Sequence, residues 1–316
     1  MISFVIPCYR SARTIGSVVA EIEKACEDIP KAAEGYEIIL VNDGSGDDTW
    51  VTIKGLAESD SSVTAIDLAR NFGQHGALMA GLSRTKGDVV ICLDDDGQTP
   101  ADEAYKLIEA LENGADVAYA RYANKQHSAF RNFGSWVNEV MAGVMLGKPA
   151  SLTVSSYFAA KRFVIDEVLK YEGAYPYLIG LVLRASDRIV NVDVTHRKRE
   201  VGVSGYTFGK LVSLWMNGFT AFSIKPLRIA TLSGTLFAMV GFLYGIYTII
   251  KKFVIPDIPV GFSALMSAIM FIGGMVMLML GLIGEYLGRL YITQNNSPQY
   301  IVREEAGPGT AKDAVR

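Results

Sequence analysis

Cysteine and histidine are scarce in this chain, which has three of each among 316 residues. Cys8, Cys26 and Cys92 stand in apolar or helical surroundings without a CxxC spacing. We therefore expect buried free thiols in a reducing compartment instead of a disulfide framework. The histidines are too few and too scattered to build a zinc cluster. The composition thus excludes the small disulfide-rich and zinc-stabilised classes of protein.

An excess of positive charge and a leader segment are also lacking. The 30 Lys and Arg residues nearly balance the 33 Asp and Glu residues, and no basic helix of the kind that binds nucleic acid is present. The first ten residues, MISFVIPCYR, predict a strand and a turn, with no basic segment leading into a long apolar run. We expect no signal peptide, no nucleic-acid partner, and a globular part that stays in the cytoplasm.

Long apolar runs are confined to the last third of the chain, although half of all residues are hydrophobic and the mean hydropathy is +0.24. Residues 229–250 and 260–283 are each about long enough to cross a bilayer and contain no charge. Their Gly, Ser and Thr residues permit close helix packing. The short connection between them predicts a two-helix transmembrane hairpin within 229–290. The alternative is a pair of buried helices in a soluble protein.

The segments beside the hairpin are less decisive. Residues 207–228 include an amphipathic stretch, 208–223, that fits either a helix at the membrane surface or a docked core helix. Basic residues both flank the hairpin and lie in its connecting loop, so the positive-inside rule alone leaves the orientation open. Residues 291–316 are predicted to be a cytoplasmic tail, loosely ordered after Ser297 because that part is polar and contains Gly and Pro.

Residues 1–206 alternate short apolar runs with helical patterns. Strands are predicted at 2–6, 36–41, 63–68, 88–93, 116–120 and 189–194. Helices are predicted at 14–28, 47–59, 74–85, 100–113 and 128–146, and an irregular segment at 147–158. Most of the strands are rich in Val and Ile and nearly continuous in apolarity, which is typical of strands covered on both faces. The pattern predicts an α/β domain with a mostly parallel sheet and helices on both faces.

Polar clusters follow three of the predicted strands: NDGS at 42–45, RNFG at 70–73 and DDD at 94–96. Ligands of open parallel sheets bind at the carboxyl ends of the strands, so we expect these clusters to share one site. The RNFG cluster opens a helix beside glycines and suits an anionic ligand. Asp43 could accept hydrogen bonds from a base or ribose, or serve only as turn chemistry, with Asp47 as an N-cap.

Asp94, Asp95 and Asp96 are adjacent carboxylates whose mutual repulsion a hard cation such as Mg²⁺ or Mn²⁺ would relieve. Residues i and i+2 of an extended segment point the same way, so Asp94 and Asp96 can act together. A cation there could bridge the phosphates of a nucleotide diphosphate and neutralise the charge of that leaving group. The alternative is a solvated acidic turn that caps the next helix.

Several runs of the sequence match one known family. They are VIPCYRSARTI, EIILVNDGSGDDT, LARNFGQHGALMAGLSRTKGDVVICLDDDGQTP, HRKREVGVSGYTFGKL, FSIKPLRI and GLIGEYLGRLY, and together they span about residues 2 to 300. The sequence resembles the family-2 inverting glycosyltransferases of the GT-A fold. It most resembles their polyprenyl-phosphate branch, which includes dolichyl-phosphate mannose synthase and bacterial undecaprenyl-phosphate sugar transferases. The ARNFGQHGALMAGL and GEYLGRLY runs are far more specific than the DxD motif.

The resemblance implies a role for each matching residue. The residues expected around the uridine or guanosine of a nucleotide-sugar donor are Pro7, Tyr9, Asp43 and Asn71. Those expected to hold its diphosphate and a Mg²⁺ or Mn²⁺ ion are Asp94, Asp96 and Gln98. Two residues are expected to face the acceptor phosphate, Arg131 and Ser135. A loop over the donor and acceptor phosphates is expected to contribute Arg199, Ser204, Tyr206 and Lys210. The catalytic set is then Asp94, Asp96, Arg131 and Arg199, and Arg121 is a weaker candidate.

Two departures from the family pattern bear on the acceptor. Many relatives have Asn-Glu after the first Tyr, where this chain has Arg10-Ser11. Many also carry an Asp, proposed as a base, in the segment that corresponds to 151–158, which here contains no carboxylate. A hydroxyl acceptor needs a base, whereas a phosphate monoester, with a second pKa of about 6, is already largely a dianion at neutral pH. The missing carboxylate therefore favours a phosphate acceptor.

The sequence thus predicts inverting transfer of a sugar from a UDP-sugar to undecaprenyl phosphate, for cell-envelope glycan or lipopolysaccharide modification. The resemblance implies a multi-pass protein of the bacterial inner membrane with a cytoplasmic catalytic domain, and a homo-oligomer is compatible with the small residues of the spans. One alternative is a transferase acting on a sugar hydroxyl, although its QxxRW-type motif is missing here. The other is a non-enzymatic membrane scaffold with a degenerate transferase domain.

Overall fold

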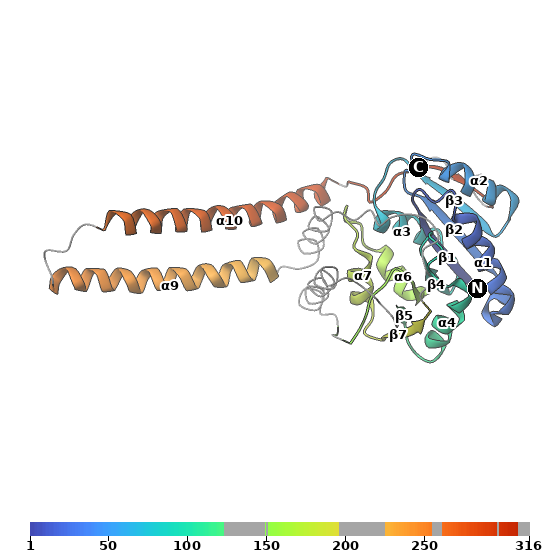
Figure 1. Cartoon of the computed structure of the whole chain (residues 1–316), viewed down its shortest axis with the longest axis horizontal. Helices are drawn as coiled ribbons and strands as arrows, with labels where there is room; N and C mark the ends of the chain where they lie inside the picture. Colours follow the sequence, from blue (N-terminus) through green and yellow to red (C-terminus); the bar gives the residue numbers. More distant parts are fainter. Residues whose placement is uncertain (123–148, 150, 196–224, 255–260, 296, 309–316) are drawn as a thin grey trace. The chain divides into compact units, whose positions relative to one another are not determined.

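The computed structural model describes residues 1–122, 149, 151–195, 225–254, 261–295 and 297–308 (Figure 1). Its strands are β1 Ile2–Cys8, β2 Tyr36–Asn42, β3 Val63–Leu68, β4 Val89–Cys92, β5 Val117–Tyr122, β6 Phe158–Lys161, β7 Ile189–Val194 and β8 Val302–Ala306. Its helices are α1 Ile15–Asp28, α2 Thr49–Ser59, α3 Gln74–Leu82, α4 Ala104–Glu112, α6 Arg162–Leu169, α7 Leu178–Ala185, α9 Lys225–Val254 and α10 Phe262–Gln294. Two short 3-10 helices are η1 Pro30–Glu34 and η2 Ala101–Glu103.

The described strands form one eight-stranded sheet in the order β7-β5-β6-β4-β1-β2-β3-β8. The central strands β4, β1, β2 and β3 are parallel, as is the pair β5–β7. β6 is antiparallel to both of its neighbours, and β8 is antiparallel to β3. The prediction of a mostly parallel sheet is confirmed, with two antiparallel strands that it did not include.

Helices cover both faces of the sheet, as predicted. Alternate β1 residues, Ile2, Phe4 and Ile6, face a core shared with α1, α2 and α4. The other face packs against α3 and α6 (Figure 1). At Gly81 of α3, an added Cβ would lie 2.5 Å from a methyl carbon of Val5, so this helix lies directly on the sheet only because the position is glycine.

All six predicted strands and the four predicted helices between residues 14 and 113 are confirmed, with ends shifted by up to four residues. The prediction of a loosely ordered tail after Ser297 is wrong for Val302–Ala306, which forms the edge strand β8, and residues 309–316 lie outside the described residues. The strand β6 and the helix α7 were not predicted. The three cysteines all lie in the described part of the chain and are buried free thiols, as expected.

The chain divides into two compact units, Met1–Thr207 with Asn296–Arg316, and Phe208–Asn295. In the second unit, α9 and α10 pack together, with the rings of Phe237 and Phe271 5.3 Å apart. Within the described residues, α10 contains one stretch long and apolar enough to cross a membrane, Phe271–Ile292, with mean hydropathy 1.7 and no buried residues.

The prediction of two spans is therefore confirmed only in part. The apolar stretch of α10 begins and ends later than the predicted 260–283, because the helix continues to Gln294. The apolar stretch of α9, Ala230–Tyr244, is shorter than a membrane span. The predicted helix at 128–146 and the amphipathic stretch at 208–223 lie outside the described residues.

Candidate active site

The carboxyl ends of β4, β1, β2 and β3 lie at one edge of the sheet, because these neighbouring strands all run parallel. The loops that follow them are joined by hydrogen bonds. The loop after β1 bonds to the loops after β2 and β4, and the loop after β3 bonds to the same two. The three polar clusters therefore lie together at this edge of the sheet, as expected.

Asp94 follows β4 and accepts hydrogen bonds on both carboxylate oxygens. Gln74 Nε2, from the first turn of α3, donates to Oδ1 at 3.1 Å, and the Ser156 hydroxyl donates to Oδ2. Burial raises the pKa of Asp94 to about 6, and the carboxylates of Asp96 and Asp95 add to the rise against the lowering effect of Ser156. The side chain is thus fixed in place, with its charge incompletely compensated.

Asp95 is turned toward the loop after β1. Its Oδ2 accepts the backbone N–H of Tyr9 at 3.0 Å and the hydroxyl of Ser11. Burial raises the pKa of Asp95, and the two hydrogen bonds oppose that rise. The middle carboxylate of the run therefore joins two loops.

Asp96 shapes the turn that follows the acidic run. Its Oδ1 accepts the backbone N–H of Gln98 at 3.1 Å, closing a turn through Gly97, whose φ is +72°. This bond fits the alternative of an acidic turn as well as it fits a ligand site. Asp96 and Gln98 are both partly exposed.

Asp43, at the end of β2, is almost fully buried and fixes the loop after β3. Its two oxygens accept the backbone N–H groups of Phe72 at 2.7 Å and Gly73 at 2.9 Å, and Asn71 Nδ2 donates to the Asp43 carbonyl at 3.0 Å. Burial raises the pKa of Asp43, opposed by these backbone bonds. The expected contact with a base or ribose would use the remaining lone pairs of this carboxylate.

The turn between β2 and α2 requires glycine at position 44. Gly44 has a φ of +60°, and an added Cβ would lie 2.5 Å from the backbone nitrogen of Asn71. The loops after β2 and β3 therefore touch backbone to backbone at this point.

Pro7 and Tyr9 lie on the same side of the site. Pro7 is partly exposed and pairs with Val41 of β2, whereas the Tyr9 side chain is 48% exposed. Arg10 has a φ of +59°, uncommon for a residue other than glycine, and its guanidinium lies 5.5 Å from the Tyr9 ring centroid. An exposed aromatic ring at a strand end can stack on a nucleobase.

Comparison with known families agrees with this geometry. Residues 3–169 match the profile of "Glycosyl transferase family 2", and residues 225–290 match the "GtrB C-terminal hairpin". The first match covers the strands from β1 to β6, the described helices from α1 to α6, and all of the acidic and donor-side residues described above. The chain belongs to glycosyl transferase family 2. The hairpin is the membrane-associated module of this family-2 transferase.

Curated relatives match the transferase along nearly its whole length. The undecaprenyl-phosphate 4-deoxy-4-formamido-L-arabinose transferase of Proteus mirabilis is 33% identical, covering 97% of this chain and 94% of the relative. The proteins of the same name from Photorhabdus laumondii and Yersinia pestis are 30% and 32% identical, covering 99% and 97% of this chain.

Solved structures support the GT-A fold. Glucosyl-3-phosphoglycerate synthase from Mycobacterium tuberculosis, in complex with Mn²⁺ and uridine-diphosphate-glucose, has a TM-score of 0.51 at 19% identity, covering 70% of this chain and 77% of that one. Mannosyl-3-phosphoglycerate synthase from Rubrobacter xylanophilus has a TM-score of 0.50 at 18% identity, covering 74% and 75%. At these identities the likeness concerns the fold alone.

The carboxylate oxygens of the acidic run are of the kind that binds a divalent cation. Asp94 and Asp96 supply the carboxylate oxygens that Mg²⁺ and Mn²⁺ prefer. Burial and, to a lesser degree, the carboxylates of Asp96 and Asp95 raise the pKa of Asp94, and a nearby cation would favour its charged form. Among the described residues, no three His, Cys, Asp or Glu side chains converge on one point. Mg²⁺ is usually bound by one or two carboxylates together with substrate phosphates, so a two-carboxylate site suffices.

All six residues predicted to bind the acceptor phosphate lie outside the described part of the chain. These are Arg131, Ser135, Arg199, Ser204, Tyr206 and Lys210. Arg121 is described: its exposed side chain pairs with Asp193 of β7 at 2.6 Å.

Two residues that donate hydrogen bonds to Asp94, Gln74 and Ser156, were not predicted as site residues. Gln74 lies in the RNFGQ run, so the motif itself was a signal. Ser156 belongs to the segment without a carboxylate and had no sequence signal, because its contact spans 62 positions of the chain.

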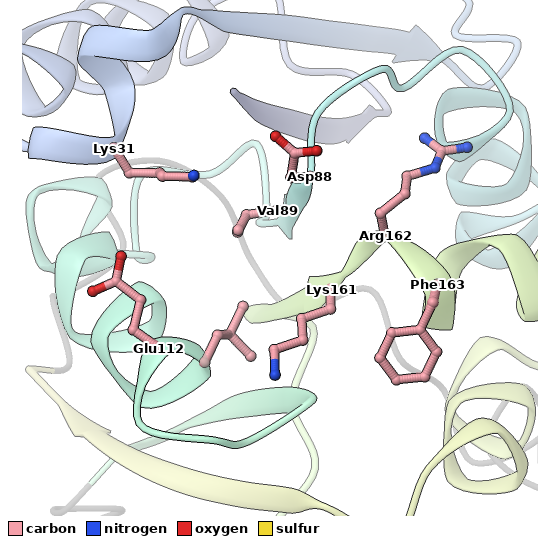
Figure 2. A pocket seen from close by; sticks show the side chains of 8 residues that line it. Lys31, Asp88, Val89, Glu112, Lys161, Arg162 and Phe163 are labelled. Atoms are coloured by element: carbon pink, nitrogen blue, oxygen red, sulfur yellow. The ribbon is translucent and has the colours of Figure 1, made fainter.

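A separate pocket of about 380 Å³ lies at the opposite edge of the sheet (Figure 2). It is lined by Asp88 and Val89 at the start of β4, and by Lys161 and Arg162 where β6 meets α6. Lys161 pairs with Asp116, and Arg162 bonds to Asp166 and to the Thr85 carbonyl. This pocket is not part of the site that follows the strand ends.

Proposed function

We propose that the chain transfers a sugar from a UDP-sugar to undecaprenyl phosphate, with inversion at the anomeric carbon. The sugar is a modified pentose of the kind named in the relatives, or else a hexose such as glucose. The observation that carries the proposal is the match over 97% of the chain to an undecaprenyl-phosphate 4-deoxy-4-formamido-L-arabinose transferase. That match spans both the site and the hairpin. The carboxylate pair of Asp94 and Asp96 supports the same reaction.

Different residues have different roles in binding the nucleotide-sugar donor. Tyr9 and Pro7 face the nucleoside, and Asp43 keeps the loop that carries Asn71 in register. Asp94 and Asp96 hold the divalent cation, and Asp95 orders the loop that carries Tyr9. The cation, when bound, neutralises the charge of the diphosphate leaving group.

The transfer itself is a single displacement. A phosphate oxygen of the lipid forms a bond to the anomeric carbon as the bond from that carbon to the diphosphate breaks, and UDP leaves with the bonding electrons. The lipid phosphate is already an anion near neutral pH, so it needs orientation and charge shielding more than a base. The predicted residues for that purpose are Arg131, Arg199 and Lys210, since Arg in particular matches phosphate oxygens with its planar fork.

The order of the chain supports a catalytic unit that stays on one side of the membrane. Residues before and after the hairpin belong to the same folded unit, and β8, which follows the hairpin, pairs with β3. A hairpin that crosses twice returns the chain to the side it left. We propose that this side is the cytoplasm. Labelling of single cysteines introduced at 255–259 and on α2 in intact and opened cells tests this orientation.

The reaction is tested with the full chain in detergent or nanodiscs, Mn²⁺, undecaprenyl phosphate, and a panel of UDP-sugars that includes UDP-glucose and UDP-4-deoxy-4-formamido-L-arabinose. Mass spectrometry of the lipid and release of UDP are both measured. We expect one donor to give a lipid heavier by one sugar that retains its single phosphate, together with an equal amount of UDP.

Two outcomes contradict the proposal. UDP release that requires an oligosaccharide acceptor and leaves the lipid phosphate unchanged would show a transferase acting on a sugar hydroxyl. No donor turnover and no binding of UDP would instead show a membrane scaffold with an inactive transferase domain.

A further inference from the structure

Arg303 connects the last strand of the sheet to the donor side of the site. It lies on β8, next to β3, and its Nη1 donates to Asp67 Oδ2 at 3.2 Å while Nη2 donates to the Ala69 carbonyl at 2.5 Å. The Asp67 side chain is only 3% exposed, whereas that of Arg303 is 60% exposed. A buried carboxylate is thus neutralised by a residue that reaches it from the surface.

Asp67 passes this constraint to the loop after β2. Its other oxygen accepts Asn42 Nδ2 at 2.7 Å, and Asn42 Oδ1 accepts the backbone N–H of Ser45 at 3.3 Å. The hydroxyl of Ser45 then accepts the backbone N–H of Arg10 at 3.0 Å. A continuous line of hydrogen bonds therefore runs from Arg303 to the residue beside Tyr9.

The same strand also fixes the loop after β3. The backbone N–H of Ala69 donates to the Ile301 carbonyl at 2.8 Å, next to the contact of Arg303 with the Ala69 carbonyl. Four residues further on, Gly73 is held by Asp43. Both ends of the loop that carries Asn71 are thereby fixed, one by β8 and one by β2.

We propose that Arg303 is a positioning residue for the nucleotide-sugar donor, although it lies on the far side of β3 and follows the membrane hairpin in the sequence. This rests on the proposed function, because the ordered loops are those expected around the nucleoside. Without Arg303, Asp67 is a buried charge facing only a neutral amide, and such a charge strongly favours rearrangement around it. The loops that carry Tyr9 and Asn71 then lose a fixed position.

The test compares three variants of Arg303 in the full chain, with the donor and lipid acceptor found in the panel. Arg303→Gln is expected to raise the KM for the donor about tenfold, as for loss of a hydrogen-bonded partner of a buried charge, with kcat changed less than threefold. Arg303→Lys, which can reach Asp67 or the Ala69 carbonyl but lacks the fork for both, is expected to fall between Arg303→Gln and the wild type. In Arg303→Gln/Asp67→Asn, loss of the uncompensated charge is expected to restore part of the donor affinity.

Arg84→Gln is the matched control. Arg84 pairs with Glu305 of the same strand at 2.7 Å, but has no contact in this structure with Asp67 or the donor-side loops. It removes an ion pair between partly exposed groups, so it is expected to lower the melting temperature no more than Arg303→Gln does, without raising the donor KM.

Calorimetry with UDP and Mn²⁺ separates this inference from the proposed function. The wild type binds UDP, and Arg303→Gln binds it about tenfold more weakly than Arg84→Gln if the inference holds. Equal UDP affinity in the two variants, with a functioning wild type, overturns the inference alone. A wild type that binds no UDP overturns the proposed function and this inference with it.

Discussion

Asp95 accepts the backbone N–H of Tyr9 at 3.0 Å, joining two residues that are 86 positions apart in the chain. The middle member of the acidic run is therefore a loop anchor. Its neighbours have other partners: Asp94 accepts hydrogen bonds from Gln74 and Ser156, and Asp96 accepts the backbone N–H of Gln98. The three carboxylates have separate tasks, and substitution of each has its own expected effect.

Replacing the carboxylates one at a time distinguishes these tasks. Asp94→Asn and Asp96→Asn are expected to remove activity in a folded protein, because each loses a charged ligand for the cation. Asp95→Asn is expected to lower the free energy of unfolding by about 1–3 kcal/mol and to keep measurable kcat, because it weakens hydrogen bonds to a buried carboxylate. Thermal denaturation and product formation are measured on all three. Full activity in Asp96→Asn contradicts the metal assignment.

Gly44→Ala tests the close approach of the loops after β2 and β3. The added methyl group meets the backbone of Arg70 and Asn71 at a positive φ, so we expect a loss of about 2 kcal/mol or more and weaker donor binding. Gly46→Ala is the control, since nothing lies within 4 Å of a Cβ there. Chemical denaturation of the two variants gives the comparison. Equal stability would show that the turn adapts to a side chain.

Stability at neutral pH is expected to increase in Asp94→Asn. The pKa of Asp94 in the folded chain, about 6, lies above the ordinary value of 3.8. The group therefore favours the folded state fully below pH 3.8, and this contribution is lost as the pH rises through 6. In EDTA at pH 7.5 the variant should be more stable than the wild type, by on the order of 2 kcal/mol, and the gain should vanish near pH 4. A gain independent of pH would contradict this origin.

Ser156 is expected to set the acidic limb of the pH–rate profile. Its hydroxyl lowers the pKa of Asp94, so Ser156→Ala should move that limb to higher pH by up to about one unit. Ser155→Ala is the control, because that hydroxyl donates to the carbonyl groups of Ala120 and Tyr157. If both variants shift the limb equally, the effect arises from the segment and not from the bond to Asp94.

The parallel core of the fold follows directly from the sequence. β1, β2 and β3 are buried on both faces, so their runs of Val, Ile and Leu are nearly unbroken and mark strands without knowledge of their neighbours. β8 reads Val-Arg-Glu-Glu-Ala and carries three charges, as edge strands often do, and its composition alone indicated a tail. What makes it a strand is its pairing with β3, more than 230 positions earlier in the chain.

The candidate site also has residues that the sequence predicts and residues that it does not. Asp94, Asp96 and Asn71 stand in recognisable motifs, so their place at the sheet edge was predictable. The tasks of Asp95 and Ser156 depend on partners 84 and 62 positions away, and nothing in the local sequence specifies those contacts. Arg303 was missed for the same reason, since Asp67 lies 236 positions earlier.

The central claim is that Asp94 and Asp96 couple a divalent cation to the diphosphate of the donor. The most direct measurement is the affinity of the full chain for UDP, by calorimetry, with and without Mn²⁺. We predict that Mn²⁺ strengthens UDP binding at least about tenfold in the wild type and in Asp95→Asn, and has no such effect in Asp94→Asn or Asp96→Asn. An equal strengthening by Mn²⁺ in Asp96→Asn and the wild type would contradict the claim.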